Sequence, residues 1–266
     1  MPGFIIDLDG TMYAGRNPIL YAGEFIRAIR DEGWPYLFLT NNSTVYPGEV
    51  AALLEELTGV PVAKEEVFTS AMAAARYIGL HGQGNRVLCI GEQALQETLA
   101  EAGFLLTAEA PDYVVQGIDR EFTYAKLAQA VSAIRDGAVY IQTNPDHLLP
   151  KENGPIPGSG AIGAAIRTAS ETDPVVIGKP SPIISRYGIE LLGLPPEEIW
   201  MVGDNLRTDI AAGAAAGTRT ALVLTGLSKP HNYEALIESS GIRPDVSLHH
   251  LMDFYRWLKD REQSPG

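Results

Sequence analysis

The chain has 266 residues, 45% of them hydrophobic and 20% charged, which is enough for one large folded domain or two smaller ones. Its formal charge of −13 argues against nucleic acid or an anionic membrane as a partner, because both attract basic patches. The single cysteine excludes an intrachain disulfide, and no run approaches the roughly 20 apolar residues of a membrane span. We therefore expect a cytoplasmic protein.

Apolar, strand-like runs alternate with helical patterns from the start of the chain. Such alternation is typical of a parallel sheet covered by helices on both faces. The first series predicts strands at 4–8 and 36–40 and helices at 22–32, 47–57 and 70–80. The glycine-rich stretch 81–85 ends this series and indicates a boundary.

A second alternation follows this boundary, and a third completes the chain. The second predicts strands at 86–90, 113–116, 139–142 and 174–177 and helices at 92–101, 124–135 and 160–170. The third predicts helices at 181–192 and 206–215 and strands at 199–202 and 220–224. We predict an α/β protein whose discontinuous core comprises residues 1–80 and 178–266, with residues 81–177 inserted as a second α/β domain.

The first strand ends in two carboxylates, Asp7 and Asp9, followed by Gly10-Thr11. Because side chains alternate along a strand, Asp7 and Asp9 can project to the same side. Two like charges held this close repel unless a cation lies between them or one stays protonated. The pair indicates a site for a hard metal ion, with one carboxylate free to act as a nucleophile.

Three further strand ends carry polar residues, and ligands bind at the carboxyl ends of strands in open α/β sheets. Taken singly, each has an ordinary explanation as a helix cap, a turn or a solvated surface charge. Together they predict one site at one edge of the sheet. The residues are Thr40, Asn41 and Asn42 after the second strand, Lys179 in Gly178-Lys179-Pro180, and Asp204 and Asn205 followed by Asp209.

Two other patterns carry less weight. The stretch 158–163 matches G-x-G-x-x-G, but Pro155-Ile156-Pro157 precedes it instead of a strand, so a glycine-rich loop opening the helix 161–170 explains it better than a dinucleotide site. His147 follows a predicted strand of the inserted domain, and it could contact a substrate or be a solvated loop residue.

The four strand ends resemble the motifs of the haloacid dehalogenase superfamily of phosphotransferases, in the same order. Asp7-Leu8-Asp9-Gly10-Thr11 matches D-x-D-G-T, Thr40 the second motif, Lys179 the third, and Gly203-Asp204 through Asp209 matches G-D-x-x-x-x-D. Thr40-Asn41-Asn42 and the long insertion resemble the NagD-like, p-nitrophenyl phosphatase branch. The resemblance implies a Rossmann-like core with a large C2-type α/β cap.

The resemblance and the chemistry agree on the reacting groups. Asp7 would attack a phosphomonoester and form an aspartyl phosphate, while Asp9 would act as general acid and then general base. Mg²⁺ would bind Asp7, the backbone carbonyl of Asp9, and Asp204.

The remaining candidates would serve the phosphate or support the ligands. Thr40, Asn41, Asn42 and Lys179 would hold phosphoryl oxygens, and His147 would contact the substrate. Asp209 would orient Lys179 or a metal-bound water from behind the metal ligands, and Asn205 would also lie behind these ligands.

We therefore expect a phosphomonoester hydrolase for a small phosphorylated metabolite. The candidate substrates, which come from the resemblance, are a sugar phosphate, a nucleotide, phosphoglycolate, pyridoxal phosphate and an aryl phosphate. A phosphomutase of the same superfamily and a non-catalytic regulator that binds a phosphorylated ligand are the alternatives. No nucleic-acid or membrane partner is expected, and an exposed face of the cap could support a homodimer.

Overall fold

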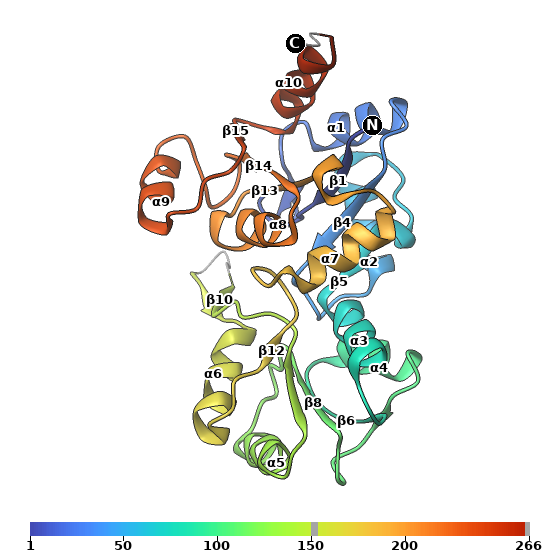
Figure 1. The fold of residues 1–266 in the computed structure, drawn as a ribbon, viewed down its shortest axis with the longest axis vertical. Helices are drawn as coiled ribbons and strands as arrows, with labels where there is room; N and C mark the ends of the chain where they lie inside the picture. Colours follow the sequence, from blue (N-terminus) through green and yellow to red (C-terminus); the bar gives the residue numbers. More distant parts are fainter. Residues whose placement is uncertain (150–153, 264–266) are drawn as a thin grey trace. The chain divides into compact units, whose positions relative to one another are not determined.

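The computed structural model describes residues 1–149 and 154–263, and the chain forms two compact units (Figure 1). The first unit comprises Met1–Thr40, Pro47–Phe68 and Lys179–Gly266, and the second comprises Asn41–Tyr46 and Thr69–Gly178. The second unit thus begins before residue 81 and also takes the short segment 41–46 from the N-terminal part of the chain. The domain bounds expected from the sequence, 1–80 with 178–266 for the core and 81–177 for the inserted domain, remain a prediction.

The first unit is built on a six-stranded sheet in the order β15-β14-β13-β1-β4-β5. In chain order this is the 3-2-1-4-5-6 arrangement of the Rossmann fold, whose direction reverses between the first and fourth strands. Here that switch point lies between β1 and β13, which pair in parallel with Ile5 beside Met201. The strands are β1 (Gly3–Ile6), β4 (Tyr36–Thr40), β5 (Val67–Thr69), β13 (Ile199–Gly203), β14 (Arg219–Val223) and β15 (Val246–Leu248).

Helices pack on both faces of this sheet, because alternate side chains of each strand point to opposite sides. Phe4 lies in edge contact with the rings of Phe25 and Phe254, whereas Ile5 lies against Gly188 on the other face. The helices are α1 (Ala22–Asp31), α2 (Pro47–Thr58), α7 (Pro182–Leu192), α8 (Ala211–Ala216), α9 (Tyr233–Ser240) and α10 (Leu251–Gln263). Short 3₁₀ turns at Lys64–Glu66 and Pro196–Glu198, and the hairpin β2 (Tyr13–Ala14) with β3 (Asn17–Pro18), complete the unit. The doubly wound, Rossmann-like core predicted from the sequence is confirmed.

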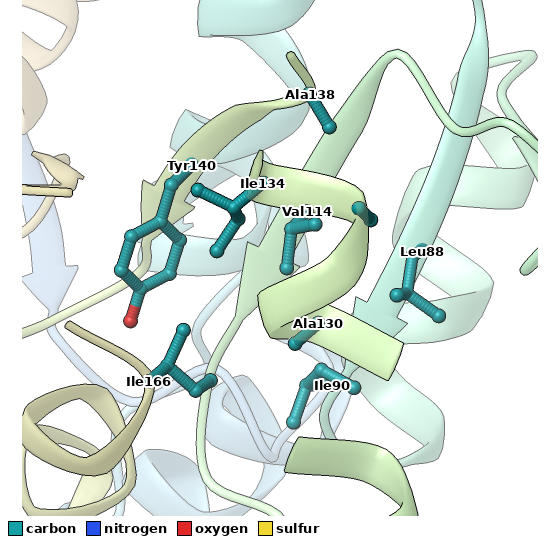
Figure 2. Packing of buried hydrophobic residues seen from close by; sticks show 9 residues of the cluster. Leu88, Ile90, Val114, Ala130, Ile134, Ala138, Tyr140 and Ile166 are labelled. Carbon is teal, nitrogen blue, oxygen red and sulfur yellow. The ribbon is translucent and has the colours of Figure 1, made fainter. Parts of the chain in front are cut away.

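The second unit has its own parallel sheet, in the order β12-β9-β8-β6-β7. Its strands are β6 (Arg86–Ile90), β7 (Leu105–Leu106), β8 (Tyr113–Gln116), β9 (Val139–Gln142) and β12 (Val175–Val176), with the antiparallel pair β10 (Leu148–Leu149) and β11 (Ile156–Pro157). Its helices are α3 (Ser70–His81), α4 (Gln93–Glu101), α5 (Tyr124–Arg135) and α6 (Ser159–Ser170). Figure 2 shows one half of its core, where Ile134 of α5 and Ile166 of α6 pack with Val114 and Tyr140 of the sheet.

In chain order the second sheet has the flavodoxin-like arrangement 2-1-3-4-5, with its switch point between β6 and β8. The chain's own segment 41–46 runs past the carboxyl end of β8, beside this position. The Oγ of Ser43 lies 2.7 Å from the place where a Cβ on Gly117, directly after β8, would stand. The hydroxyl of Tyr46 donates to Glu97 of α4, 2.5 Å away.

The structure adds elements that the sequence analysis did not predict. They are the short strands β2, β3, β5, β7, β10, β11 and β15, the two 3₁₀ turns, and the helices α9 and α10. The predicted helix 206–215 begins instead as a π-helical turn, Leu206–Ile210, before α8. The glycine-rich stretch opens α6, as expected from the sequence. Glycine is needed there because a Cβ on Gly158 would collide with the carbonyl oxygen of Asp146, and a Cβ on Gly160 with that of Pro145. Within the described residues, no helix has both the length and the apolar character needed to cross a bilayer.

Candidate active site

The candidate site lies in the first unit, at the switch point of its sheet. Asp7 directly follows β1 and remains tied to the sheet, because its amide donates to the carbonyl of Val202 at 2.9 Å. Asp204 directly follows β13, and Thr40, buried, ends β4. These carboxyl ends of neighbouring parallel strands bring side chains from both ends of the chain to one place.

Lys179 is held at the centre of this site by two carboxylates. Its Nζ lies 2.5 Å from Oδ1 of Asp7 and 2.7 Å from Oδ1 of Asp209, and only 2% of the residue is exposed. Burial alone would lower the pKa of Lys179, but the charges of Asp209 and Asp7 raise it above its ordinary value. Lys179 is therefore a permanent cation that fixes the orientation of Asp7.

The site nonetheless holds more negative than positive charge. One carboxylate oxygen from each of Asp7, Asp204 and Asp209 lies within 4.8 Å of the others. Burial, followed by the charge of Asp209, raises the pKa of Asp7 well above its ordinary value, while Lys179 acts in the opposite direction. The same two causes raise the pKa of Asp204 to about 7, although the N–H of Leu227 stabilises its charged form. Such mutual repulsion is relieved when a cation binds among the carboxylates.

The available oxygen atoms fit a hard divalent cation. Oδ1 of Asp7 accepts from Lys179, and Oδ2 of Asp204 accepts from Leu227 N at 2.5 Å. These two contacts leave Oδ2 of Asp7 and Oδ1 of Asp204 to face other groups. Asp209 differs, because its Oδ1 accepts from Lys179 and its Oδ2 accepts from the amide of Asn205 at 3.0 Å. Asp7 and Asp204 thus have oxygen atoms to offer Mg²⁺, and Asp209 is engaged in holding Lys179 and the loop.

Asp9 and its neighbours form a tight turn beside these groups. Gly10 adopts a left-handed conformation with φ of 87°, and the amides of Thr11, Met12 and Tyr13 all donate to the carbonyl of Leu8. Asp9 remains exposed, yet the protein around it desolvates its carboxyl and raises its pKa, with the charge of Lys179 acting in the opposite direction. The Thr11 hydroxyl is fully buried and has no hydrogen-bond partner within the described residues.

The structure brings together only part of the predicted site within one unit. Asp7, Lys179, Asp204 and Asp209 converge, and Asn205 caps the π-helical turn that carries Asp209 by accepting from Arg207 N at 2.9 Å. π-helical turns are frequent at functional sites.

Asn41, Asn42 and His147 belong to the second unit. The amide of Asn41 donates to Asp146 at 3.1 Å, and Oδ1 of Asn42 accepts from the backbone and hydroxyl of Thr44. His147 is exposed. Their part in phosphate or substrate binding stays a prediction.

Sequence reasoning missed the segment Thr225–Leu227, which follows β14 and contacts both Asp204 and Gly10. The sequence does contain a signal for this segment, because polar residues at the end of a predicted strand marked the other site residues and Thr225-Gly226 follows the predicted strand 220–224.

Comparisons with known proteins agree with this fold and with a hydrolase family. Residues 4–105 match the family described as haloacid dehalogenase-like hydrolase, and residues 176–254 match a second model of HAD-like hydrolases. The chain is 44% identical to the 5'-nucleotidase YutF of Bacillus subtilis (strain 168), covering 85% of this chain and 88% of that protein. It is also 44% identical to the acid sugar phosphatase of Staphylococcus aureus (strain USA300), over 85% of this chain and 87% of that one.

Solved structures show the same likeness. The p-nitrophenyl phosphatase from Archaeoglobus fulgidus superimposes with a TM-score of 0.91 at 35% identity, covering 95% of this chain and 97% of that chain. NagD from E. coli K-12 gives a TM-score of 0.87 at 34% identity, covering 94% and 97%. The chain belongs to the haloacid dehalogenase-like hydrolases. Within that family it is a NagD-like phosphatase.

Proposed function

We propose that this phosphatase is a Mg²⁺-dependent phosphomonoester hydrolase that acts through an aspartyl phosphate on Asp7. The observation that carries the proposal is the convergence of Asp7, Asp204 and Asp209 around the buried ammonium of Lys179. This arrangement supplies a fixed nucleophile, a fixed cation and free oxygen ligands at one switch point.

In the first half-reaction, a carboxylate oxygen of Asp7 forms a bond to phosphorus as the bond from phosphorus to the leaving oxygen breaks. The protonated carboxyl of Asp9 gives its proton to that leaving oxygen. The raised pKa of Asp9 suits this role, because it increases the protonated fraction near neutral pH. The cation of Lys179 stabilises the negative charge on the phosphoryl oxygens.

In the second half-reaction, the carboxylate of Asp9 removes a proton from water, and the water oxygen attacks phosphorus. The bond between phosphorus and Asp7 breaks, which releases inorganic phosphate and restores both carboxyl groups. Mg²⁺ held by Asp7, the backbone carbonyl of Asp9, and Asp204 would neutralise charge and polarise the phosphoryl group. Thr40, Asn41, Asn42 and His147 belong to this proposal as phosphate-binding or substrate-contacting residues.

We propose a small phosphorylated metabolite as the substrate and the cytoplasm as the site of action. The relatives support this class of substrate, since they are named for nucleotides, sugars and p-nitrophenyl phosphate. A panel containing a sugar phosphate, nucleoside monophosphates, phosphoglycolate, pyridoxal phosphate and an aryl phosphate would identify the preferred member. Gel filtration would test whether the protein forms a homodimer.

The test of the mechanism is Asp7→Asn, with Asp31→Asn on the exposed end of α1 as the matched control. We expect release of phosphate from p-nitrophenyl phosphate to fall by at least about 10³-fold in Asp7→Asn and to stay unchanged in the control. Intact-mass spectrometry of acid-quenched enzyme should detect a phosphoryl adduct in the wild type alone. Undiminished turnover by Asp7→Asn would overturn the assignment, and transfer to a second sugar hydroxyl instead of water would indicate a phosphomutase.

A further inference from the structure

The segment Thr225–Leu227, here called the β14 loop, contacts the candidate site from the strand next to β13. Regular pairing of β14 ends nearby, where the amide of Leu224 donates to the carbonyl of Leu248 at 3.0 Å. The loop carries no carboxylate or histidine. Its contacts are nonetheless directed at two elements of the site, Asp204 and the turn that contains Gly10.

Hydrogen bonds connect the loop to both elements. The amide of Leu227 donates to Oδ2 of Asp204 at 2.5 Å, and the amide of Ser228 donates to the Asp204 carbonyl at 3.1 Å. The hydroxyl of Thr225 donates to the carbonyl of Gly10 at 2.7 Å. The loop thereby holds Oδ2 of Asp204 and leaves Oδ1 outside this contact.

Two glycines make this fit possible. A Cβ on Gly226 would lie 2.1 Å from Oδ2 of Asp204 and 2.7 Å from the Cα of Gly10. A Cβ on Gly10 would lie 2.6 Å from the same Oδ2. The carboxylate of Asp204 is therefore clamped between two glycine backbones. Gly226, unlike Gly10, does not have a positive φ, so an alanine there meets a purely steric obstacle.

We propose that the β14 loop is a positioning element that fixes Asp204 for the metal and joins it to the Asp9-Gly10 turn. Gly226 and Leu227 set the orientation of the Asp204 carboxylate, and Thr225 holds the turn that presents the backbone carbonyl of Asp9. This inference rests on the proposed Mg²⁺ site. Partners that orient metal ligands in this way typically change metal affinity by about 10–100-fold when they are removed.

The test measures Mg²⁺ binding to the substrate-free enzyme by isothermal titration calorimetry, so that it does not depend on turnover. We expect Gly226→Ala to weaken binding by about 10–100-fold, and Thr225→Val to weaken it by a smaller factor of at least about threefold. Thr225→Ser retains the donor and should restore wild-type affinity. In these variants the KM for the phosphorylated substrate should change less than the Mg²⁺ concentration that gives half-maximal kcat, because the loop contacts the metal ligand Asp204.

Two matched controls separate positioning from general loss of stability. Thr218→Val removes a buried hydroxyl that has no partner in the described structure, near the opposite end of β14. Gly48→Ala adds a Cβ to α2 where nothing lies within 4 Å. Both should bind Mg²⁺ as the wild type does.

Each outcome decides a different question. If Gly226→Ala fails to fold, the comparison of Thr225→Val with Thr225→Ser still decides, because neither adds an atom to the clamp. Folded variants that bind Mg²⁺ within about twofold of the wild type would overturn the positioning role and leave the proposed function standing. A wild-type enzyme that binds no Mg²⁺ would overturn both.

Discussion

Replacing Asp204 by asparagine should stabilise the enzyme when metal is absent. Asp204 is 2% exposed, and one of its oxygens lies within 4.8 Å of oxygens from Asp7 and Asp209. Asparagine has nearly the same shape and can still accept the hydrogen bond from Leu227 N, but it carries no charge. The substitution therefore removes repulsion while keeping the local structure.

The size of the effect follows from the raised pKa. Burial and the charge of Asp209 move the pKa of Asp204 from 3.8 to about 7, which at about 1.36 kcal/mol per pH unit is roughly 4 kcal/mol of stability lost when the group ionises. The buried amide of asparagine keeps part of the desolvation cost, so we expect about half of this to be regained. For a chain of this size, about 2 kcal/mol corresponds to a rise in Tm of roughly 4–8 °C.

The pH dependence has a definite sign. Between about pH 4 and pH 7 the folded protein keeps a proton on Asp204 that the unfolded chain has released, so wild-type stability falls as pH rises through this window. Below about pH 4 both states are protonated, and the advantage of Asp204→Asn disappears. Above about pH 7 the advantage is complete.

Differential scanning calorimetry of chelator-treated protein at pH 4.5 and pH 8 measures this difference, with Asp31→Asn as a control at an exposed site. Added Mg²⁺ should reverse the order, because it stabilises the wild type by mass action and binds the variant weakly. A metal-free Asp204→Asn that melts at or below the wild-type temperature at pH 8 would refute the reasoning. So would a difference that is the same at both pH values.

Three further predictions concern other buried groups. Lys179→Met should lower the free energy of unfolding by about 3–5 kcal/mol, because it leaves the carboxylates of Asp7 and Asp209 without their cation. Adding Asp209→Asn should recover part of this loss, and chemical denaturation that shows no recovery would contradict the pairing. Cys89 is half-buried, and desolvation raises the pKa of its thiol to about 12, so it should react with iodoacetamide at pH 8 much more slowly in the native protein than after unfolding; equal rates would contradict the raised pKa. Gly163→Ala should destabilise the second unit, because the new Cβ would lie 2.0 Å from Nε2 of Gln142; increased amide exchange in α6 would report this, and unchanged exchange would contradict it.

The sequence predicted the strand ends well because each joins an apolar run to a polar residue. Asp7, Lys179 and Asp204 could be assigned to one site, since the rule for parallel sheets brings such ends together. The short strand Val246–Leu248 lacks a pattern long enough to recognise, so it is specified by tertiary contacts more than by local pattern. The helix Leu251–Gln263 does carry a readable signal, because its buried residues Leu251, Phe254 and Leu258 recur at helical spacing.

Two parts of the site could not be predicted, each for a physical reason. Thr225-Gly226 is recognisable in the sequence as a polar strand end, but the role of Gly226 depends on a distance to Asp204 that chain order does not contain. Asn41 directly follows Thr40 in sequence, yet its backbone carbonyl accepts from Ser70 and Asn144 of the second unit. Adjacent residues can thus belong to different compact units, and spacing alone does not reveal where the division falls.

The segment 41–46 has a consequence for ligand design. The chain contains two sheets whose strand orders ordinarily create a ligand site at the switch point. Among the described residues, the carboxylates that could hold a metal converge at the one between β1 and β13. In the second sheet, Ser43 lies beside Gly117 at the end of β8, and Tyr46 donates to Glu97 of α4. We therefore expect a screen for nucleotide-like effectors to find little binding at that position of the second unit. Replacing Ser43 and Tyr46 by smaller residues is the direct route to engineering a ligand site there.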